Sequence, residues 1–347
     1  MNSEQQNFDP ETLKAMPQEG AGDAGTAALA APGQKRRAPF KKMELIRNWK
    51  YYLMAAPVIV LYFLFAYLPL PGIILAFKKY TITGGIFGSP WVGMENFKVF
   101  FGGADLWRVT RNILLLNSGN LVLGTVMNVG GAILLNELFS TKAKKIYQNI
   151  LFLPTFFSAL LVAKFFNMML SNDIGLINDV LKRIGLEPVM WYNNSAYWIP
   201  IVMIAMCWKG LGYGIVLYLA AISGFDGELY EAAYIDGAGK WKQVTKITLP
   251  LLKPIVILQI LLSIGRIFSG DFMFVFAFVG DNYVLRETLD IVETYIFRTL
   301  LGAGGTGGTM DYGLTAAIGL YQSVLGAVVV FTSNFIVRRC NKDYALF

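Results

Sequence analysis

The side chains that carry most enzyme chemistry are scarce in this chain of 347 residues. It has no histidine, which excludes imidazole acid/base catalysis, histidine-dependent nucleophiles and imidazole metal sites. Its two cysteines, Cys207 and Cys340, are too few for a disulfide framework or a four-cysteine zinc site. No G-x-x-x-x-G-K-S/T phosphate loop occurs, so any ATP hydrolysis takes place on another chain. We therefore predict a protein that is not an enzyme, with no catalytic residue, metal or cofactor of its own.

Three cations, Lys164, Lys209 and Arg266, stand inside long apolar segments. A lone cation at such a depth in a bilayer costs several kcal/mol, so each requires a water-filled cavity or an ion-pair partner. Asp271 is one candidate partner, and cavity lining and a structural ion pair both stay open at this point. Three glycines within residues 208–214 predict a loosened helix, which is tolerated at this depth only around a cavity or a protein contact.

Polar and small residues share helical faces in three of the apolar segments, at 100° per residue. The faces are formed by Asn117, Asn120 and Asn128, by Gln259, Ser263, Arg266 and Gly270, and by Thr315, Gly319, Gln322, Gly326 and Ser333. Such faces avoid lipid. We expect helix packing to explain the glycines and most of the third face, because small and weakly polar residues bind membrane helices together.

The elements that position these residues are long apolar segments. The chain is 55% hydrophobic and only 15% charged, whereas an average soluble protein is about 25% charged. A bilayer-spanning helix needs about 20 apolar residues, and six segments are long enough: 52–76, 112–136, 149–170, 197–222, 254–278 and 313–337. The sequence therefore predicts an all-α integral membrane protein with six transmembrane helices.

The connections between the spans alternate in charge. Lys and Arg are concentrated before residue 52, at 137–148, at 223–253 and after residue 337. The positive-inside rule then predicts that both termini are cytoplasmic. We expect residues 1–45 to form a disordered basic cytoplasmic tail and residues 46–347 to form one six-helix domain. The net charge of +7 is explained by juxtamembrane Lys and Arg facing anionic lipid, so no nucleic-acid partner is expected.

The basic loop 223–253 has the pattern of two short helices. Asp226 is a suitable N-cap, and the acidic Glu228 favours a first turn. We expect a short helix up to Ile235, a stop at residues 237–239, and a second short helix, 241–247, before the next span. The alternative, an amphipathic helix that touches only lipid, is disfavoured because acidic residues at its start repel anionic lipid.

This loop also carries a spaced motif. Glu231-Ala232-Ala233 is followed by three residues, Gly237, nine residues, Ile247, one residue and Leu249-Pro250. The pattern resembles the EAA motif of MetI-like permease subunits of bacterial binding-protein-dependent ABC importers, of the type I class. Residues 91–97 (WVGMENF) look like the W-V-G-x-x-N-F element of the first outer loop. Three further segments are similar to the subfamily that imports complex sugars and polysaccharide fragments: residues 208–214 (WKGLGYG), 228–230 (ELY) and 345–347 (ALF).

The resemblance implies a subunit of the bacterial plasma membrane that forms a translocation path. Its partners would be a second homologous permease, a cytoplasmic ATPase dimer that binds ATP, an extracytoplasmic solute-binding protein and a sugar substrate. The ATPase-coupling residues would be Glu231, Ala232, Ala233, Asp236, Gly237, Ala238, Ile247, Leu249 and Pro250. The path would include Arg266, Lys209, Trp208, Tyr213, Gln259 and Asn120, because aromatic faces pack on sugar rings while polar groups satisfy hydroxyls.

Three other functions compete with sugar import. A permease for an amino acid or phosphate has the same motif. An ion-coupled secondary transporter would have intramembrane carboxylates, of which Asp271 is the one candidate. A membrane-embedded enzyme would require paired carboxylates or a nucleophile with its base, and the apolar segments contain neither.

Overall fold

The computed structural model describes residues 48–280, 282–302 and 310–340. Within these ranges the chain is nearly all helical, and the β contact is an isolated bridge between Lys78 and Trp91. The expected tail, residues 1–45, and the 345–347 element lie outside the described residues. The chain divides into two compact units, Met1–Phe65 and Ala66–Phe347.

The described part of the first unit is mainly one apolar helix, α2 (Trp49–Tyr62). It continues as a π-helical turn, η2 (Phe63–Tyr67), and the second unit opens with a 3₁₀ segment, η3 (Leu70–Phe77). By length and composition, Trp49–Phe77 is apolar enough to cross a membrane. This agrees with the first expected span.

The second unit contains four long helices. They are α5 (Asp105–Asn136), α9 (Trp198–Ser223), α12 (Leu249–Ile264) and α16 (Tyr312–Cys340). With Trp49–Phe77, the described chain holds five helical stretches long and apolar enough to span a membrane, or six if one bent pair counts as a span. The all-α membrane fold is confirmed.

The third expected span, 149–170, is not one straight helix. The chain forms α6 (Thr141–Phe152), a 3₁₀ turn η4 (Leu153–Phe156) and α7 (Ala159–Met169), and the two α-helices are bent by 101°. Pro154 stands in the turn and has no N–H to donate. Ser158 then starts a new helix, because its side chain accepts a hydrogen bond from the Leu161 N–H at 3.2 Å.

The fifth expected span, 254–278, has different bounds in the structure. Its helix starts earlier, since α11 (Lys240–Gln243), a π-helical turn η7 (Val244–Thr248) and α12 follow one another without a break. Residues 241–247 are therefore the start of the spanning helix and not the separate second short helix that the sequence predicted. The helix also ends earlier, at Ile264, and α13 (Phe272–Val279) is a separate helix capped by Asp271. We call residues 265–271 the span break.

The predicted loosening of the helix at residues 208–214 is also wrong, because α9 is continuous through them. The glycines instead permit close packing. A Cβ at Gly212 would lie 2.4 Å from the Cα of Phe152, and one at Gly214 would lie 2.2 Å from the side-chain amide of Asn128. Small residues at such positions let membrane helices approach each other.

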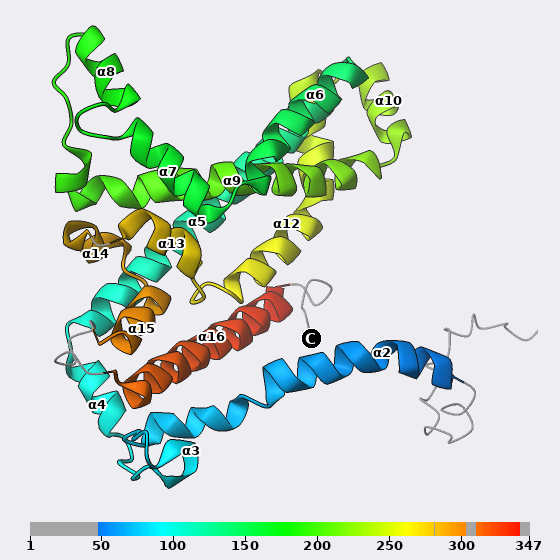
Figure 1. The fold of residues 1–347 in the computed structure, drawn as a ribbon. Helices are drawn as coiled ribbons and strands as arrows, with labels where there is room; N and C mark the ends of the chain where they lie inside the picture. Colours follow the sequence, from blue (N-terminus) through cyan, green and yellow to red (C-terminus); the bar gives the residue numbers. More distant parts are fainter. Residues whose placement is uncertain (1–47, 281, 303–309, 341–347) are drawn as a thin grey trace, which may run out of the picture. The chain divides into compact units, whose positions relative to one another are not determined.

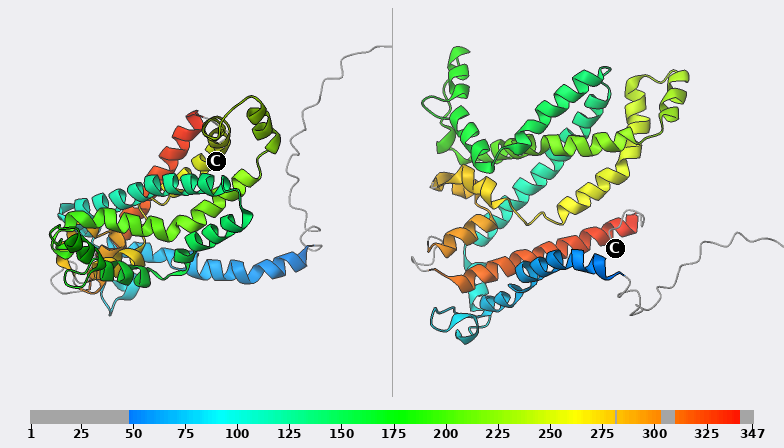
Figure 2. Two further views of the ribbon diagram at one scale, coloured as in Figure 1. Left: turned by 90° about the horizontal axis from the view of Figure 1, so that it is seen from above. Right: turned by 45° about the vertical axis from the view of Figure 1, so that its right-hand side comes forward.

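Within the second unit, α5 packs along α9, and α16 packs against η3, α4 (Glu95–Gly102) and α15 (Val292–Leu300). Figures 1 and 2 show α10 (Gly227–Ile235) at one end of this unit and α8 (Leu176–Arg183) at the other. The described residues also form α3 (Gly85–Gly88), α14 (Tyr283–Leu289) and two short 3₁₀ helices, η5 (Trp191–Asn193) and η6 (Ser195–Tyr197).

Candidate functional site

A cleft of about 360 Å³ lies among α5, α9, α12 and the span break, and we call it the polar cleft. Its polar lining comes from amides, hydroxyls and one guanidinium: Asn117, Asn120, Thr125, Asn128, Tyr213, Tyr218, Gln259, Ser263, Arg266 and Ser269. Its lining contains no Asp or Glu. A concave site with convergent hydrogen-bonding groups is the form that a small-molecule path takes.

The cleft brings together four of the six residues expected to line a path: Asn120, Tyr213, Gln259 and Arg266. Asn120, Gln259 and Arg266 were found through the shared polar faces in the sequence, and Tyr213 through its aromatic ring. Asn117, Asn128 and Ser263 were expected on the same faces but not in the site, and all three line the cleft.

Trp208 and Lys209 do not line the polar cleft. The Trp208 ring packs among aromatic rings of the 157–166 segment, stacking on Phe165 at 5.9 Å between centroids. The Lys209 Nζ donates to the Thr155 carbonyl oxygen at 3.4 Å. Both side chains therefore contact the bend between α6 and α7, a contact that the apolar pattern of the segment did not reveal.

Arg266 lies in the span break, and its exposed side chain borders the cleft. The described ion pairs do not include it. Asp271, the candidate partner, instead caps α13 by accepting from the Phe274 N–H at 3.0 Å. Of the two open alternatives for Arg266, the structure therefore has the cavity position and not the Asp271 ion pair.

Asn117 fixes the span break to α5. Its Nδ2 donates to the carbonyl oxygens of Ile267 at 2.7 Å and Ser269 at 3.1 Å. Those carbonyls lack the helical partners they would have in a continuous span, and a buried polar group without a partner is costly. The Asn117 amide thus satisfies the break and places Arg266 between α5 and α12.

A second group fixes the break from the α16 side. The Glu293 Oε1 accepts from the Gly270 N–H and from the Gln322 Nε2, each at 2.6 Å. Gln322 also donates to the Phe268 carbonyl oxygen. Glu293 and Gln322 line a separate cleft of about 450 Å³, and Ser269 borders both clefts. The break is therefore a thin wall held on two sides by side-chain hydrogen bonds.

The first part of the EAA motif stands on α10 and at its end, and its last three residues, Ile247, Leu249 and Pro250, stand on η7 and at the start of α12. The Asp226 Oδ1 accepts from the Glu228 N–H at 3.0 Å, so the expected N-cap is present. Gly237 has φ +74°, a left-handed conformation that L side chains rarely adopt. The Ala238 N–H donates to the Ala233 carbonyl oxygen, and the Gly237 N–H to that of Tyr234. This is a Schellman C-cap, and it ends the helix where the sequence predicted.

The outer side of this loop is polar at some positions and strongly apolar at others. Glu231 is exposed, while Tyr234, Ile235 and Trp241 are 76%, 83% and 79% exposed. Ala232, Asp236, Gly237, Leu249 and Pro250 are exposed as well, and Ala233, Ala238 and Ile247 are half-buried. Contiguous exposed aromatic and aliphatic side chains mark an interaction surface.

The inner side of the loop is tied to the helices that line the polar cleft. The Lys240 Nζ lies 2.9 Å from the Glu137 Oε2, directly after α5. The hydroxyls of Tyr230 and Thr248 are 3.0 Å apart and join α10 to η7. Glu137, Tyr230 and Lys240 line an open cleft of about 340 Å³. The loop is therefore a folded element connected to α5 and α12.

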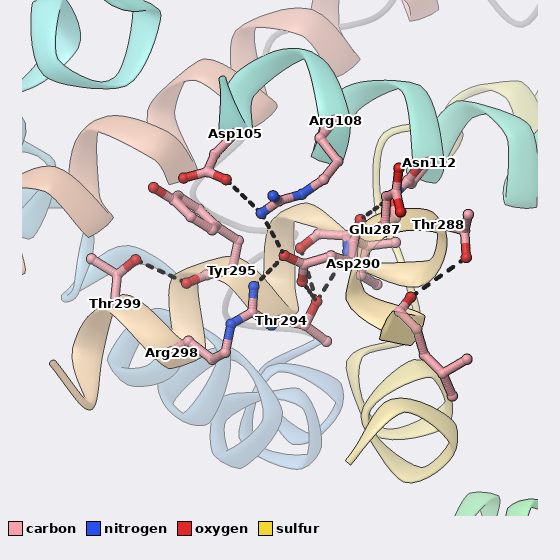
Figure 3. A network of polar contacts seen from close by, with 12 residues as sticks. Asp105, Arg108, Asn112, Glu287, Thr288, Asp290, Thr294, Tyr295, Arg298 and Thr299 are labelled. Atoms are coloured by element: carbon pink, nitrogen blue, oxygen red, sulfur yellow. Dashed lines mark hydrogen bonds and ion pairs between the residues drawn. The ribbon is translucent and has the colours of Figure 1, made fainter. Parts of the chain in front are cut away.

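At the opposite end of α5, a charged network holds α14 and α15 (Figure 3). The Asp290 side chain is fully buried and pairs with Arg298 and, at 3.4 Å, with Arg108. The Asn112 Nδ2 donates to the Asp290 carbonyl oxygen at 3.0 Å. Burial raises the pKa of the nearby Tyr295 to about 12, so its phenol stays protonated. Sequence reasoning missed this network because its partners are far apart in the chain.

An all-helical membrane unit with a polar cleft and a structured EAA loop defines an ABC importer permease. The family model described as binding-protein-dependent transport system inner membrane component matches residues 120–342. The chain belongs to this family of multi-pass inner-membrane transport subunits.

Two known relatives and one solved structure are similar to this chain over most of its length. The chain is 31% identical to Protein LplB of Bacillus subtilis (strain 168), covering 84% of this chain and 89% of the relative. It is 31% identical to the polygalacturonan/rhamnogalacturonan transport system permease protein YteP of the same organism, covering 87% and 91%. A crystal structure of a bacterial alginate ABC transporter in complex with an alginate pentasaccharide-bound periplasmic protein matches with a TM-score of 0.76, 31% identity and coverage of 86% and 98%. The type I importer permease fold expected from the sequence is confirmed.

Proposed function

We propose that this chain forms a translocation path for oligosaccharides or polysaccharide fragments and couples that path to a separate ATPase. The observation that carries the proposal is the polar cleft. Its asparagine and glutamine amides both donate and accept, as sugar hydroxyls require, and the exposed Tyr213 offers a face for a sugar ring. Arg266, Gln259 and Asn120 line the same path.

The relatives support a saccharide as the cargo. YteP is named for polygalacturonan and rhamnogalacturonan, and the similar crystal structure is that of an alginate transporter. Because these proteins cover most of the present chain, the inference draws on the permease as a whole and not on one shared motif.

The EAA loop is proposed as the coupling element. Its exposed Tyr234, Ile235 and Trp241 would enter a groove of the ATPase, while the exposed Glu231 would meet a basic residue there. The full importer would contain this chain, a second homologous permease, an ATPase dimer and an extracytoplasmic solute-binding protein. This arrangement requires the loop and both termini to be cytoplasmic.

Uptake by right-side-out membrane vesicles tests the proposal. Vesicles that contain the complete importer and internal ATP, with proton and sodium gradients collapsed, should accumulate labelled oligosaccharide when the binding protein is added. Vesicles without this chain are the control. Uptake that stops when the gradients collapse would indicate an ion-coupled carrier, and uptake of amino acids or phosphate alone would reassign the cargo.

A further inference from the structure

We infer that Arg266 makes the polar cleft a site for saccharides that carry carboxylate groups, an inference that rests on the proposed function. The uronic acid units of acidic oligosaccharides carry such groups. Arg266 would thus set selectivity within the path, beyond the assignment of a sugar permease.

The charge of the cleft is the first step. Arg266 is the one charged side chain in its lining. The two acids beside the span break do not line the cleft: Asp271 caps α13, and Glu293 lines the other cleft, where its Oε1 accepts from Gly270 and Gln322. Within the described chain, the guanidinium therefore stands in the cleft without a compensating carboxylate.

The chemistry of guanidinium is the second step. Its planar fork of N–H groups matches a carboxylate with two parallel hydrogen bonds, and charge-assisted bonds of this kind are stronger than neutral ones. A neutral sugar presents only hydroxyls and would leave the cation without a counter-ion in a region of reduced dielectric. A carboxylated sugar supplies that counter-ion.

The surroundings of Arg266 provide the rest of a saccharide site. Gln259 and Ser263 precede it on α12 and also line the cleft. Across the cleft, the Asn128 Oδ1 is buried without a hydrogen-bond partner, so it can accept from a hydroxyl. Tyr213 is 66% exposed and lines the same space. A carboxylate at Arg266 would thus leave the ring hydroxyls facing amides and the ring face near an aromatic side chain.

Direct binding separates this cleft from the selectivity of the solute-binding protein. We would measure binding of trigalacturonate and trimannuronate to the complete importer in nanodiscs without the binding protein. Each acid is compared with its methyl ester, which keeps the sugar rings but removes the charge. The expected result is roughly tenfold tighter binding of an acid than of its ester, about 1.4 kcal/mol.

Three variants test the residue. Arg266→Gln should bring the acid-to-ester ratio close to one, and Arg266→Lys should keep part of it because the charge remains. Lys164→Gln removes another intramembrane cation, one that does not line the cleft, and should leave the ratio unchanged.

The outcomes distinguish the role of Arg266 from the proposed function in saccharide import. Equal binding of acids and esters, or a ratio that survives Arg266→Gln, overturns the role of Arg266 while saccharide import stands. Binding and import of maltotriose alone has the same consequence. Dissociation of the complex in Arg266→Gln would show that Arg266 pairs with the second permease instead, and that too overturns the inference. Failure to import any saccharide overturns the proposed function itself.

Discussion

The Lys240 Nζ lies 2.9 Å from the Glu137 Oε2, and this ion pair joins the start of the α11–α12 helix to the end of α5. Both helices line the polar cleft farther along, through Gln259 on α12 and Asn120 on α5. A movement of the EAA loop would therefore pull on two walls of the cleft together.

Removing this link should weaken coupling more than stability. Lys240→Gln should reduce substrate-stimulated ATP hydrolysis about two- to fivefold, because a partly exposed ion pair contributes at most about 1 kcal/mol. The Lys240 and Glu137 side chains are 69% and 31% exposed. Lys242→Gln, a neighbouring exposed cation, is the matched control. The charge-reversed pair, Glu137→Lys with Lys240→Glu, should restore part of the stimulation; no rescue would argue against the link.

Glycine should be required at position 237 because of its backbone conformation, and not because a side chain would lack space there. Its φ is +74°, and no atom lies within 4 Å of the position that a Cβ would occupy, so a side chain there is strained but not crowded. Gly237→Ala should cost about 1 kcal/mol of local stability, and the β-branched Gly237→Val about 1–2 kcal/mol. Both should reduce stimulated ATPase activity and uptake while the protein still inserts.

Gly239 provides the comparison for Gly237, since it has φ −67° and equally open space. Gly239→Ala should leave the stimulated ATPase activity near the wild-type value. Normal stimulated activity in a purified Gly237→Val complex would falsify the coupling role of this turn.

Two glycines of α9 should respond in opposite directions to alanine. At Gly212 a Cβ would meet the Phe152 backbone at 2.4 Å, so Gly212→Ala should destabilise by about 1–3 kcal/mol through overpacking. At Gly210 nothing lies within 4 Å, so Gly210→Ala should be neutral or stabilising by up to about 1 kcal/mol. Thermal unfolding of the purified complex measures both. Equal shifts would contradict the packing of α9 on the α6–α7 bend.

The buried carboxylate of Asp290 should be important for stability. Asp290→Asn removes the negative charge that Arg108 and Arg298 share, and Arg298 then has no described ion-pair partner, whereas Arg108 still pairs with Asp105. Breaking a buried pair costs about 3–5 kcal/mol. Asp179→Asn breaks the pair between Asp179 and Arg183, whose side chains are 53% and 77% exposed. That variant should change stability by less than about 1 kcal/mol. Monodispersity after stepwise heating compares them, and similar midpoints would contradict the network.

Local features of this protein follow from its sequence alone. The Asp226 cap, the end of α10 at Gly237 and the apolar length of the spans depend on residues a few positions apart. Helix caps and glycine turns are short-range chemistry, so their residue types predict them. The shared face of Asn117, Asn120 and Asn128 also follows from helical periodicity.

The tertiary structure decided what these faces meet. The third and fifth segments have almost uniform apolar patterns, and their breaks are satisfied by distant partners: Asn117 bonds to Ile267, 150 positions away. Arg108 and Asp290 are 182 positions apart, and neither position indicates the other. Whether Arg266 meets Asp271 or an open cleft depends on where the helix stops. Sequence pattern cannot determine that stop, because the carbonyl groups freed at a break are stabilised only by side chains that the fold brings to them.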